Sequence, residues 1–407
     1  MHFFIISSKS PFHLAKTPFR YATLKNKAAR GELREWLGIE MEISMMKDNN
    51  TRAFLALVKA GLWEKEIRLL PFGKIDLNEI YRISEEQSVV GVVAVGLEHV
   101  TDVKASQEVL MKFIGSTLRI EKWSRSMNEF IPTLFRLLKD KDVRALLVKG
   151  QGVALCYDQP LRRSAGDIDL LLDAENYERA KELLFPLADD VESEDRFSKH
   201  QALKLHGFVV ELHGRMPFAL SRRVDKVIDE VLEDAVKKGG VDTWRSDGVD
   251  VLIPNPDNHL FLVFTHFLHH FFIEGVGLRQ ISDWCRMLWR YREDLDIKLL
   301  ESRIRRAGLL TEWKAFAALA VDFLGMPIEA MPFYDERYSA KGHQILKRVI
   351  SSGNMGHNRD MSYRTRYKGA TYKIVATWRR FLDFVYLFPI FPGDSPRFFV
   401  RYVTGKV

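Results

Sequence analysis

The chain has 407 residues, of which 46% are hydrophobic and 28% are charged, and its net charge is +7. This composition is typical of a globular protein of two or three domains, and the modest positive charge permits an anionic ligand without requiring nucleic acid. The two cysteines lack metal-type spacing and no apolar run reaches the ~18 residues of a membrane helix, which argues against a disulfide scaffold, a cysteine-based zinc site and a membrane span.

These features predict a cytoplasmic protein without membrane association. The first third of the chain is predicted to be helical after a segment that lacks periodicity. Residues 1–48 are basic and lack periodicity, so we expect a flexible extension, or a reading frame that begins too far upstream. Helices are expected over 51–62, 77–86, 105–120 and 123–139. Asp76 or Asn78 is placed to cap the second of these helices. We therefore predict an N-terminal helical region over 49–140.

The middle of the sequence combines apolar strand patterns with short helices. Strands are expected over 143–148, 168–172 and 208–213, and helices over 150–157 and 174–185. Asp173 is placed to cap the second helix, and the polar segment 189–200 is predicted to be a loop. These elements predict an α+β core over 141–250.

The last part of the sequence is helical and then strongly basic. Helices are expected over 255–272, 278–291, 297–307 and 311–324, and they form a predicted helical domain over 251–333. Residues 334–407 contain 14 Lys and Arg against 5 Asp and Glu. Three prolines near the end, at 389, 392 and 396, predict an irregular basic C-terminal tail.

Three carboxylates are the candidate metal ligands. Asp167 and Asp169 are two residues apart in a predicted strand, so both side chains lie on one face. Glu211 lies in the middle of another predicted strand and joins them if the two strands pair. Clustered carboxylates repel unless a cation lies between them, and Mg²⁺, or alternatively Mn²⁺, prefers such oxygen ligands. The alternatives to metal binding are an exposed acidic strand end for Asp167 and Asp169, and a structurally paired glutamate for Glu211.

A glycine turn upstream is the candidate phosphate site. Lys149 and Gly150 follow an apolar strand and open a short helix, where backbone N–H groups can hold a phosphate. Gly150 and Gly152 allow close backbone approach, and Lys149 and Arg163 add positive charge. The alternatives are a solvated lysine in a tight turn, and pairing of Arg163 with local acids. A phosphate site beside a dicarboxylate site indicates phosphoryl or nucleotidyl transfer.

Two further pairs occur at helical i, i+4 spacing. His266 and His270 share one helix face, but two more zinc ligands are lacking, so hydrogen bonding in a core or cleft is favoured over nucleotide contact. Arg279 and Asp283 are predicted to form a structural ion pair.

With these residues in view, the sequence resembles the bacterial, uncharacterised type 5 nucleotidyltransferase family of the DNA polymerase β-like superfamily. The matching segments are 147–150, Tyr157 with 160–163, 166–172 and 210–213, with weaker similarity in the helices that hold His266 and Asp283. The similarity runs from about residue 50 onward and is specific over 143–215. One departure is that Lys149-Gly150 replaces the usual Gly-Ser of the superfamily turn.

The resemblance implies an α+β fold with a nucleotidyltransferase-like mixed sheet core, flanking helices and a C-terminal helical domain. It implies Asp167, Asp169 and Glu211 as the metal-binding and catalytic acids and Gly150 as the phosphate-turn glycine. We therefore predict a Mg²⁺-dependent enzyme that transfers NMP from an NTP, with ATP as the default, to an unknown acceptor hydroxyl. The acceptor would be a small molecule, RNA or protein.

Two rival interpretations remain open. One is a non-catalytic nucleotide- or RNA-binding protein with the same fold, whose basic, aromatic-rich tail contacts RNA by charge and stacking. The other is a toxin-like nucleotidyltransferase that acts on tRNA or a partner protein.

Overall fold

The computed structural model divides the chain into Met1–Lys47 and Asp48–Val407 and describes residues 48–194, 199–216 and 220–404. The flexible extension expected over 1–48 therefore lies outside the described residues, apart from Asp48. Asp48 is the N-cap of the first described helix, and its carboxylate accepts hydrogen bonds from the N–H groups of Asn50 and Thr51.

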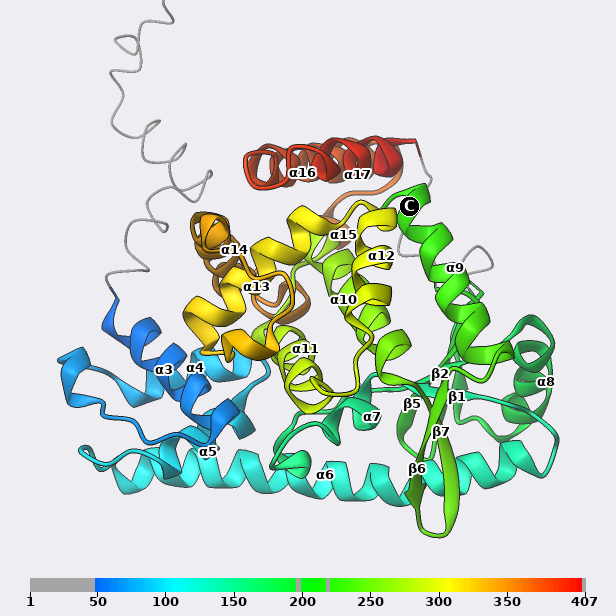
Figure 1. Cartoon of the computed structure of the whole chain (residues 1–407), viewed down its shortest axis with the longest axis horizontal. Helices are drawn as coiled ribbons and strands as arrows, with labels where there is room; N and C mark the ends of the chain where they lie inside the picture. The colour runs from blue at the N-terminus through cyan, green and yellow to red at the C-terminus, as the bar shows by residue number, and fades with distance from the viewer. Residues whose placement is uncertain (1–47, 195–198, 217–219, 405–407) are drawn as a thin grey trace, which may run out of the picture. The chain divides into compact units, whose positions relative to one another are not determined.

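The N-terminal helical region contains four α-helices. They are α3 (Asn49–Trp63), α4 (Leu77–Glu86), α5 (Val90–Glu98) and α6 (Gln107–Lys139). Asp76 caps α4 and Ser106 caps α6. The two helices expected over 105–120 and 123–139 are one continuous helix of 33 residues, the long helix of Figure 1. Glu121 and Lys122, between the two patterns, are good helix formers, so nothing interrupts the backbone there.

Helices α3 and α5 pack with their backbones in contact. Gly61 and Gly96 lie at this contact, where an added Cβ would overlap the carbonyl oxygens of Val92 and Leu57, respectively. The apolar, glycine-punctuated segment that forms α5 is therefore a buried helix whose glycines permit close approach.

A five-stranded mixed sheet forms the centre of the fold, in the order β1-β2-β5-β4-β3. The strands are β1 (Leu146–Val148), β2 (Ile168–Leu171), β3 (Asp190–Val191), β4 (His200–Leu205) and β5 (Phe208–His213). Only the β2–β5 pair is parallel; the other neighbours are antiparallel. β3 and β4 were not predicted from the sequence, and β3 lies inside the segment expected to be a loop.

One face of this sheet is buried under helices. Alternate strand residues, among them Leu147, Leu170 and Val210, form one apolar core with the C-terminal half of α6 and with α8 (Ala174–Leu184). Since side chains alternate along a strand, Asp169, Glu211 and His213 lie on the opposite face. The short helix α7 (Gly150–Ala154) follows β1 directly.

The C-terminal half of the chain is one helix, a two-stranded ribbon and then a series of helices. The further elements are α9 (Arg222–Lys237), β6 (Val241–Ser246), β7 (Val249–Pro254), α10 (Pro256–Ile273), α11 (Leu278–Arg290), α12 (Ile297–Ala307), α13 (Leu310–Leu324), α14 (Ser339–Ser352), α15 (Tyr363–Arg366), α16 (Gly369–Leu387) and α17 (Asp394–Val403). Short 3₁₀ turns are η1 (Leu70–Phe72), η2 (Pro160–Arg162), η3 (Phe185–Leu187), η4 (Ile328–Ala330), η5 (Glu336–Tyr338) and η6 (Asn354–Gly356).

The expected irregular tail over 334–407 is mostly helical. Pro389 and Pro392 fall between α16 and α17, and Pro396 falls in the first turn of α17. A proline in the first turn costs no intrahelical hydrogen bond, so these residues separate helices without preventing them.

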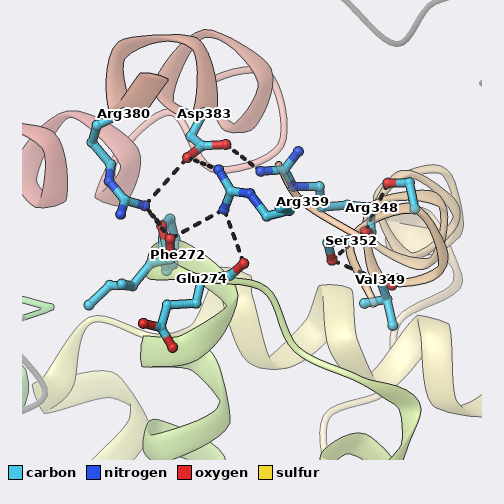
Figure 2. A network of polar contacts seen from close by, with 10 residues as sticks. Phe272, Glu274, Arg348, Val349, Ser352, Arg359, Arg380 and Asp383 are labelled. Atoms are coloured by element: carbon cyan, nitrogen blue, oxygen red, sulfur yellow. Dashed lines mark hydrogen bonds and ion pairs between the residues drawn. The ribbon is translucent and has the colours of Figure 1, made fainter. Parts of the chain in front are cut away.

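A buried carboxylate holds this helical tail to the rest of the fold (Figure 2). Asp383 of α16 accepts hydrogen bonds from Arg348, Arg359 and Arg380. Arg359 and Arg380 also donate to the last carbonyl groups of α10, those of Phe272, Ile273 and Glu274. Cations are favourable at the negative end of a helix dipole, so this cluster joins α16, α14 and the C-terminus of α10.

Among the helices placed within 48–404, none combines the length and apolar character that a membrane crossing requires.

Candidate functional site

Three carboxylates converge on the face of the sheet opposite the apolar core. Asp167 precedes β2, Asp169 lies within it, and Glu211 is the register partner of Asp169 on the parallel strand β5. One oxygen from each of the three side chains lies within 4.8 Å of the others. Asp169 is almost fully buried, at 1% exposure, while Asp167 and Glu211 are partly exposed. The sequence predicted this trio, and the parallel pairing of β2 with β5 brings it together.

The side chain of Lys149 lies against these acids. Its Nζ is 2.6 Å from Asp169 Oδ1 and 3.1 Å from His266 Nε2. Burial lowers the pKa of Lys149, but the charges of Asp169, Asp167 and Glu211 outweigh that effect and raise it. The ammonium group is therefore a cation supplied by the chain itself.

The backbone turn that carries Lys149 is strained. Lys149 has φ +58° and Gly150 has φ +44°, the left-handed region that favours glycine. A Cβ on Gly150 would lie 3.2 Å from the carbonyl oxygen of Asp167, so the turn closely approaches the backbone of the loop that carries Asp167. The Lys149 N–H donates to His259 Nε2 at 3.1 Å, which fixes the start of α7 against α10. Gly152 is buried in ordinary contact with Ile253 and His259.

Two histidines extend the cluster along the sheet. His200 of β4 and His213 of β5 are register partners, and each places Nε2 near Glu211 Oε2, at 3.2 Å and 3.4 Å. His213 Nε2 is also 2.9 Å from Asp169 Oδ1. No role for either histidine was predicted from the sequence, and the strand β4, which carries His200, was not predicted either.

The electrostatics of the cluster shift the pKa values of its carboxylates in opposite directions. The neighbouring charge of Asp169, reinforced by burial, raises the pKa of Asp167. Burial also raises the pKa of Glu211, but hydrogen bonds from His200 and His213 outweigh it, and the pKa falls below its usual range. For His213, burial favours the neutral ring, yet the hydrogen bonds to Asp169 and Glu211 raise its pKa.

Three histidines of α10, His259, His266 and His270, have lowered pKa values. Desolvation lowers the pKa of His259 to about 4 and that of His270 to about 3, and it lowers the pKa of His266 well below its ordinary value. His266 contacts Lys149 and is 3.1 Å from His270. This agrees with hydrogen bonding in a core or cleft, the interpretation favoured from the sequence.

Arg163 is engaged by another element. Its guanidinium binds Asp283 with two hydrogen bonds, of 3.0 Å and 2.7 Å, and the Tyr157 hydroxyl donates to the same carboxylate at 2.8 Å. Arg162 pairs in the same way with Glu98 and Glu121. Of the two alternatives for Arg163, the geometry favours pairing with a local acid, which fixes the loop before Asp167.

Arg279 differs from its predicted role. Asp283 pairs with Arg163, whereas Arg279 donates to the Ser164 carbonyl at 3.1 Å. Within the described residues, its Nε is buried without a hydrogen-bond partner. Burial and the charge of Arg163 lower the pKa of Arg279, and Arg279 in turn lowers that of Asp167. The i, i+4 spacing gave no sign that this arginine faces the loop before β2.

The donor set fits a hard divalent cation. Three carboxylates from adjacent strands, partly buried and mutually repelling, offer the oxygen ligands that Mg²⁺ takes in nucleotide-binding enzymes. The nearby Lys149 ammonium partly neutralises the same charges, so an ion and this lysine would share the site.

The fold and the acidic cluster together describe an α+β protein of nucleotidyltransferase type. Residues 73–325, from the segment before α4 through α13, match the family model described as uncharacterised nucleotidyltransferase. This match covers more than half of the chain, so the protein belongs to that family, and the resemblance inferred from the sequence is confirmed.

Comparisons with curated protein sequences and with solved structures do not extend this family assignment. No curated protein sequence matches the chain. Among solved structures, an antigenic nucleotidyltransferase-like protein from Paracoccidioides brasiliensis is similar at 17% identity and a TM-score of 0.31, over 49% of this chain and 93% of that one. A score this low carries no argument about the present chain.

Proposed function

We propose that this protein is a Mg²⁺-dependent nucleotidyltransferase that transfers NMP from an NTP, with ATP as the first candidate, to an acceptor hydroxyl. The observation that carries the proposal is the convergence of Asp167, Asp169 and Glu211 within 4.8 Å beside the Lys149-Gly150 turn. Membership of the nucleotidyltransferase family supports the NTP as substrate.

Each residue of the site has a separate role in this proposal. Asp167, Asp169 and Glu211 would hold Mg²⁺, which supplies positive charge at the transferring phosphoryl group. Glu211 is also placed to accept a proton from the acceptor hydroxyl, because its carboxylate is partly exposed beside the other two acids.

The remaining residues would hold the triphosphate. Lys149 would exchange its contact with Asp169 for a phosphate oxygen, and Gly150 and Gly152 would let the backbone approach. Arg163 is occupied by Asp283, so it would orient the loop, and Arg279, which also contacts that loop, is the better phosphate contact.

The test is nucleotide binding and pyrophosphate release with and without Mg²⁺ or Mn²⁺, over a panel of hydroxyl acceptors. We expect Asp167→Asn and Asp169→Asn to lower product formation by at least about 100-fold, because loss of a metal ligand removes several kcal/mol of charge stabilisation. Asp190→Asn, on the exposed strand β3, is the matched control. Wild-type rates in both site variants would rule the proposal out.

A non-catalytic nucleotide-binding protein is the second candidate, and the position of Lys149 favours it. An ammonium group 2.6 Å from Asp169 balances part of the acidic charge without any ion. This candidate predicts nucleotide binding that is unchanged by chelators, with no release of pyrophosphate.

The RNA-binding form of this candidate gains less support than the tail's composition suggests. Tail arginines that form ion pairs are Arg337, Arg348, Arg359, Arg379, Arg380, Arg397 and Arg401. Fewer positive charges are therefore free to neutralise phosphates than the excess of basic residues indicates.

A further inference from the structure

A second group of metal-ligand side chains lies next to the acidic trio. His200, Glu211 and His213 present ligand atoms that all lie within 4.8 Å of one another. The register of the sheet produces this group, since His200 lies opposite His213 across β4 and β5 while Glu211 lies two residues before His213 on the same face of β5.

Two distances within this group match those between the ligands of one tetrahedral ion. Metal–ligand bonds of about 2.0–2.1 Å place two ligands of a tetrahedral ion about 3.3–3.4 Å apart. The distances from Glu211 Oε2 to the two histidine Nε2 atoms are 3.2 Å and 3.4 Å. Both histidines direct the same ring nitrogen at one carboxylate oxygen.

We propose that His200, His213 and Glu211 form a site for a divalent transition-metal ion of the zinc type, distinct from the acidic Mg²⁺ site. Imidazole nitrogens favour Zn²⁺ and Co²⁺ over Mg²⁺, and two histidines with one carboxylate leave a fourth position open for water or a substrate. The His200 side chain is 33% exposed, so an ion reaches the site from solvent. His213 would give up its hydrogen bond to Asp169 when it binds the ion.

If the protein carries out the proposed nucleotidyl transfer, this second site affects that reaction. This effect rests on the proposed function. Glu211 belongs to both groups of ligands, so an ion on the histidines would either complete a two-metal site or compete with Mg²⁺ for Glu211. The existence of the site does not depend on turnover and is measured without a nucleotide.

The experiment uses the full-length protein, stripped of metal by chelation and titrated with Co²⁺ alone. Co²⁺ bound by nitrogen and oxygen ligands in a tetrahedral site has a visible absorption band, and Zn²⁺ should remove it by competition. The variants are His200→Asn, His213→Asn and Asp167→Asn. The control is His206→Asn, at the exposed turn of the same β4–β5 hairpin, where asparagine tolerates the φ of +50°.

We expect the wild type and His206→Asn to bind one Co²⁺ with the visible band. His200→Asn and His213→Asn should weaken Co²⁺ binding by at least about 100-fold, because loss of a direct ligand costs more than loss of an outer partner. Asp167→Asn should keep the cobalt band while it loses Mg²⁺-dependent nucleotide binding. Circular dichroism checks each fold, and Gln replaces Asn at any position where the variant unfolds.

Two results would overturn the site. One is a wild type without the visible band. The other is His200→Asn binding Co²⁺ like the wild type while Asp167→Asn does not, which would place the ion on the acidic trio. A normal cobalt site together with unaffected turnover in Asp167→Asn would instead contradict the proposed function alone.

Discussion

At the scale of single residues, Lys149 forms the ion pair that balances part of the charge of the acidic cluster. Its ammonium group lies 2.6 Å from a carboxylate that is 1% exposed, and the charges of three acids raise its pKa. Removing one partner of such a buried pair leaves an uncompensated charge, which typically costs about 3–5 kcal/mol.

Lys149→Met should therefore lower the free energy of unfolding by about 3–5 kcal/mol without divalent ions. Added Mg²⁺ should raise the Tm of the variant more than that of the wild type, because the ion replaces the missing charge. Thermal melts with and without Mg²⁺ measure this, with exposed Lys141→Met as the control. An equal Mg²⁺ effect in both proteins would mean that the lysine and the ion do not share the acids.

Glu312 is the residue with the clearest pH dependence. It is 1% exposed within α13, and burial, together with the nearby Asp394 carboxylate, raises its pKa well above the ordinary 4.5. Above pH 4.5 the unfolded chain releases this proton while the folded chain keeps it. The free energy of unfolding must therefore fall as pH rises, by at most about 1.4 kcal/mol per pH unit, until the folded pKa is reached.

Glu312→Gln removes this proton and keeps a donor for the hydrogen bond to Asp394. We expect the variant to equal the wild type near pH 4.5 and to become more stable than it as pH rises to about 7.5. Denaturant unfolding across this range tests the sign, with exposed Glu329→Gln as the control. A stability difference that is flat with pH would show that Glu312 is ionised in the folded protein.

At the scale of elements, the close packing of α3 on α5 depends on two glycines. A Cβ on Gly96 would overlap the Leu57 carbonyl oxygen, a backbone atom that cannot move by rotating a side chain. Gly115 lies in the interior of α6, and a Cβ added there would have no neighbouring atom within 4 Å, so the same substitution meets open space.

Gly96→Ala should destabilise the protein by about 1–3 kcal/mol, since the two helices must move apart. Gly115→Ala should stabilise it by about 0.5–1 kcal/mol, because alanine is the better helix former and meets no neighbour. Urea unfolding of the two variants gives the comparison. Equal effects would mean that the α3–α5 contact is looser than this packing requires.

At the scale of the whole molecule, Asp383 connects segments that are far apart in the sequence. It is 7% exposed, and its carboxylate accepts hydrogen bonds from three arginines. Two of these arginines also donate to the last carbonyl groups of α10 (Figure 2). Since His266 and His270 lie on α10, this cluster supports one wall of the site from the tail.

Asp383→Asn should lower the free energy of unfolding by about 3–5 kcal/mol, because three largely buried arginines lose their common counter-ion. Amide hydrogen exchange should become faster in α16 and in the last turn of α10, which mass spectrometry resolves by peptide. Asp360→Asn, which breaks an exposed pair with Arg379, should change stability by no more than about 1 kcal/mol. Unchanged exchange in α16 would show that other contacts hold the tail.

The sequence by itself determined most helix starts, the strands that carry the acids and the chemistry of the acids. Alternation along a strand placed Asp167 and Asp169 together, and the cap residues Asp76 and Asp173 predicted helix starts that the structure confirms. These features depend on neighbours within a few residues, which a sequence shows directly.

The tertiary structure alone decided what meets the acids. The parallel β2–β5 pairing sets Glu211 beside Asp169, and the unpredicted strand β4 brings His200 to Glu211. The partners of Lys149 and Arg163 come from β2 and α11, and Asp383 gathers its arginines from three segments. Strand order and ion pairing between distant segments depend on how hydrophobic faces pack across the whole chain, and no local pattern encodes that choice.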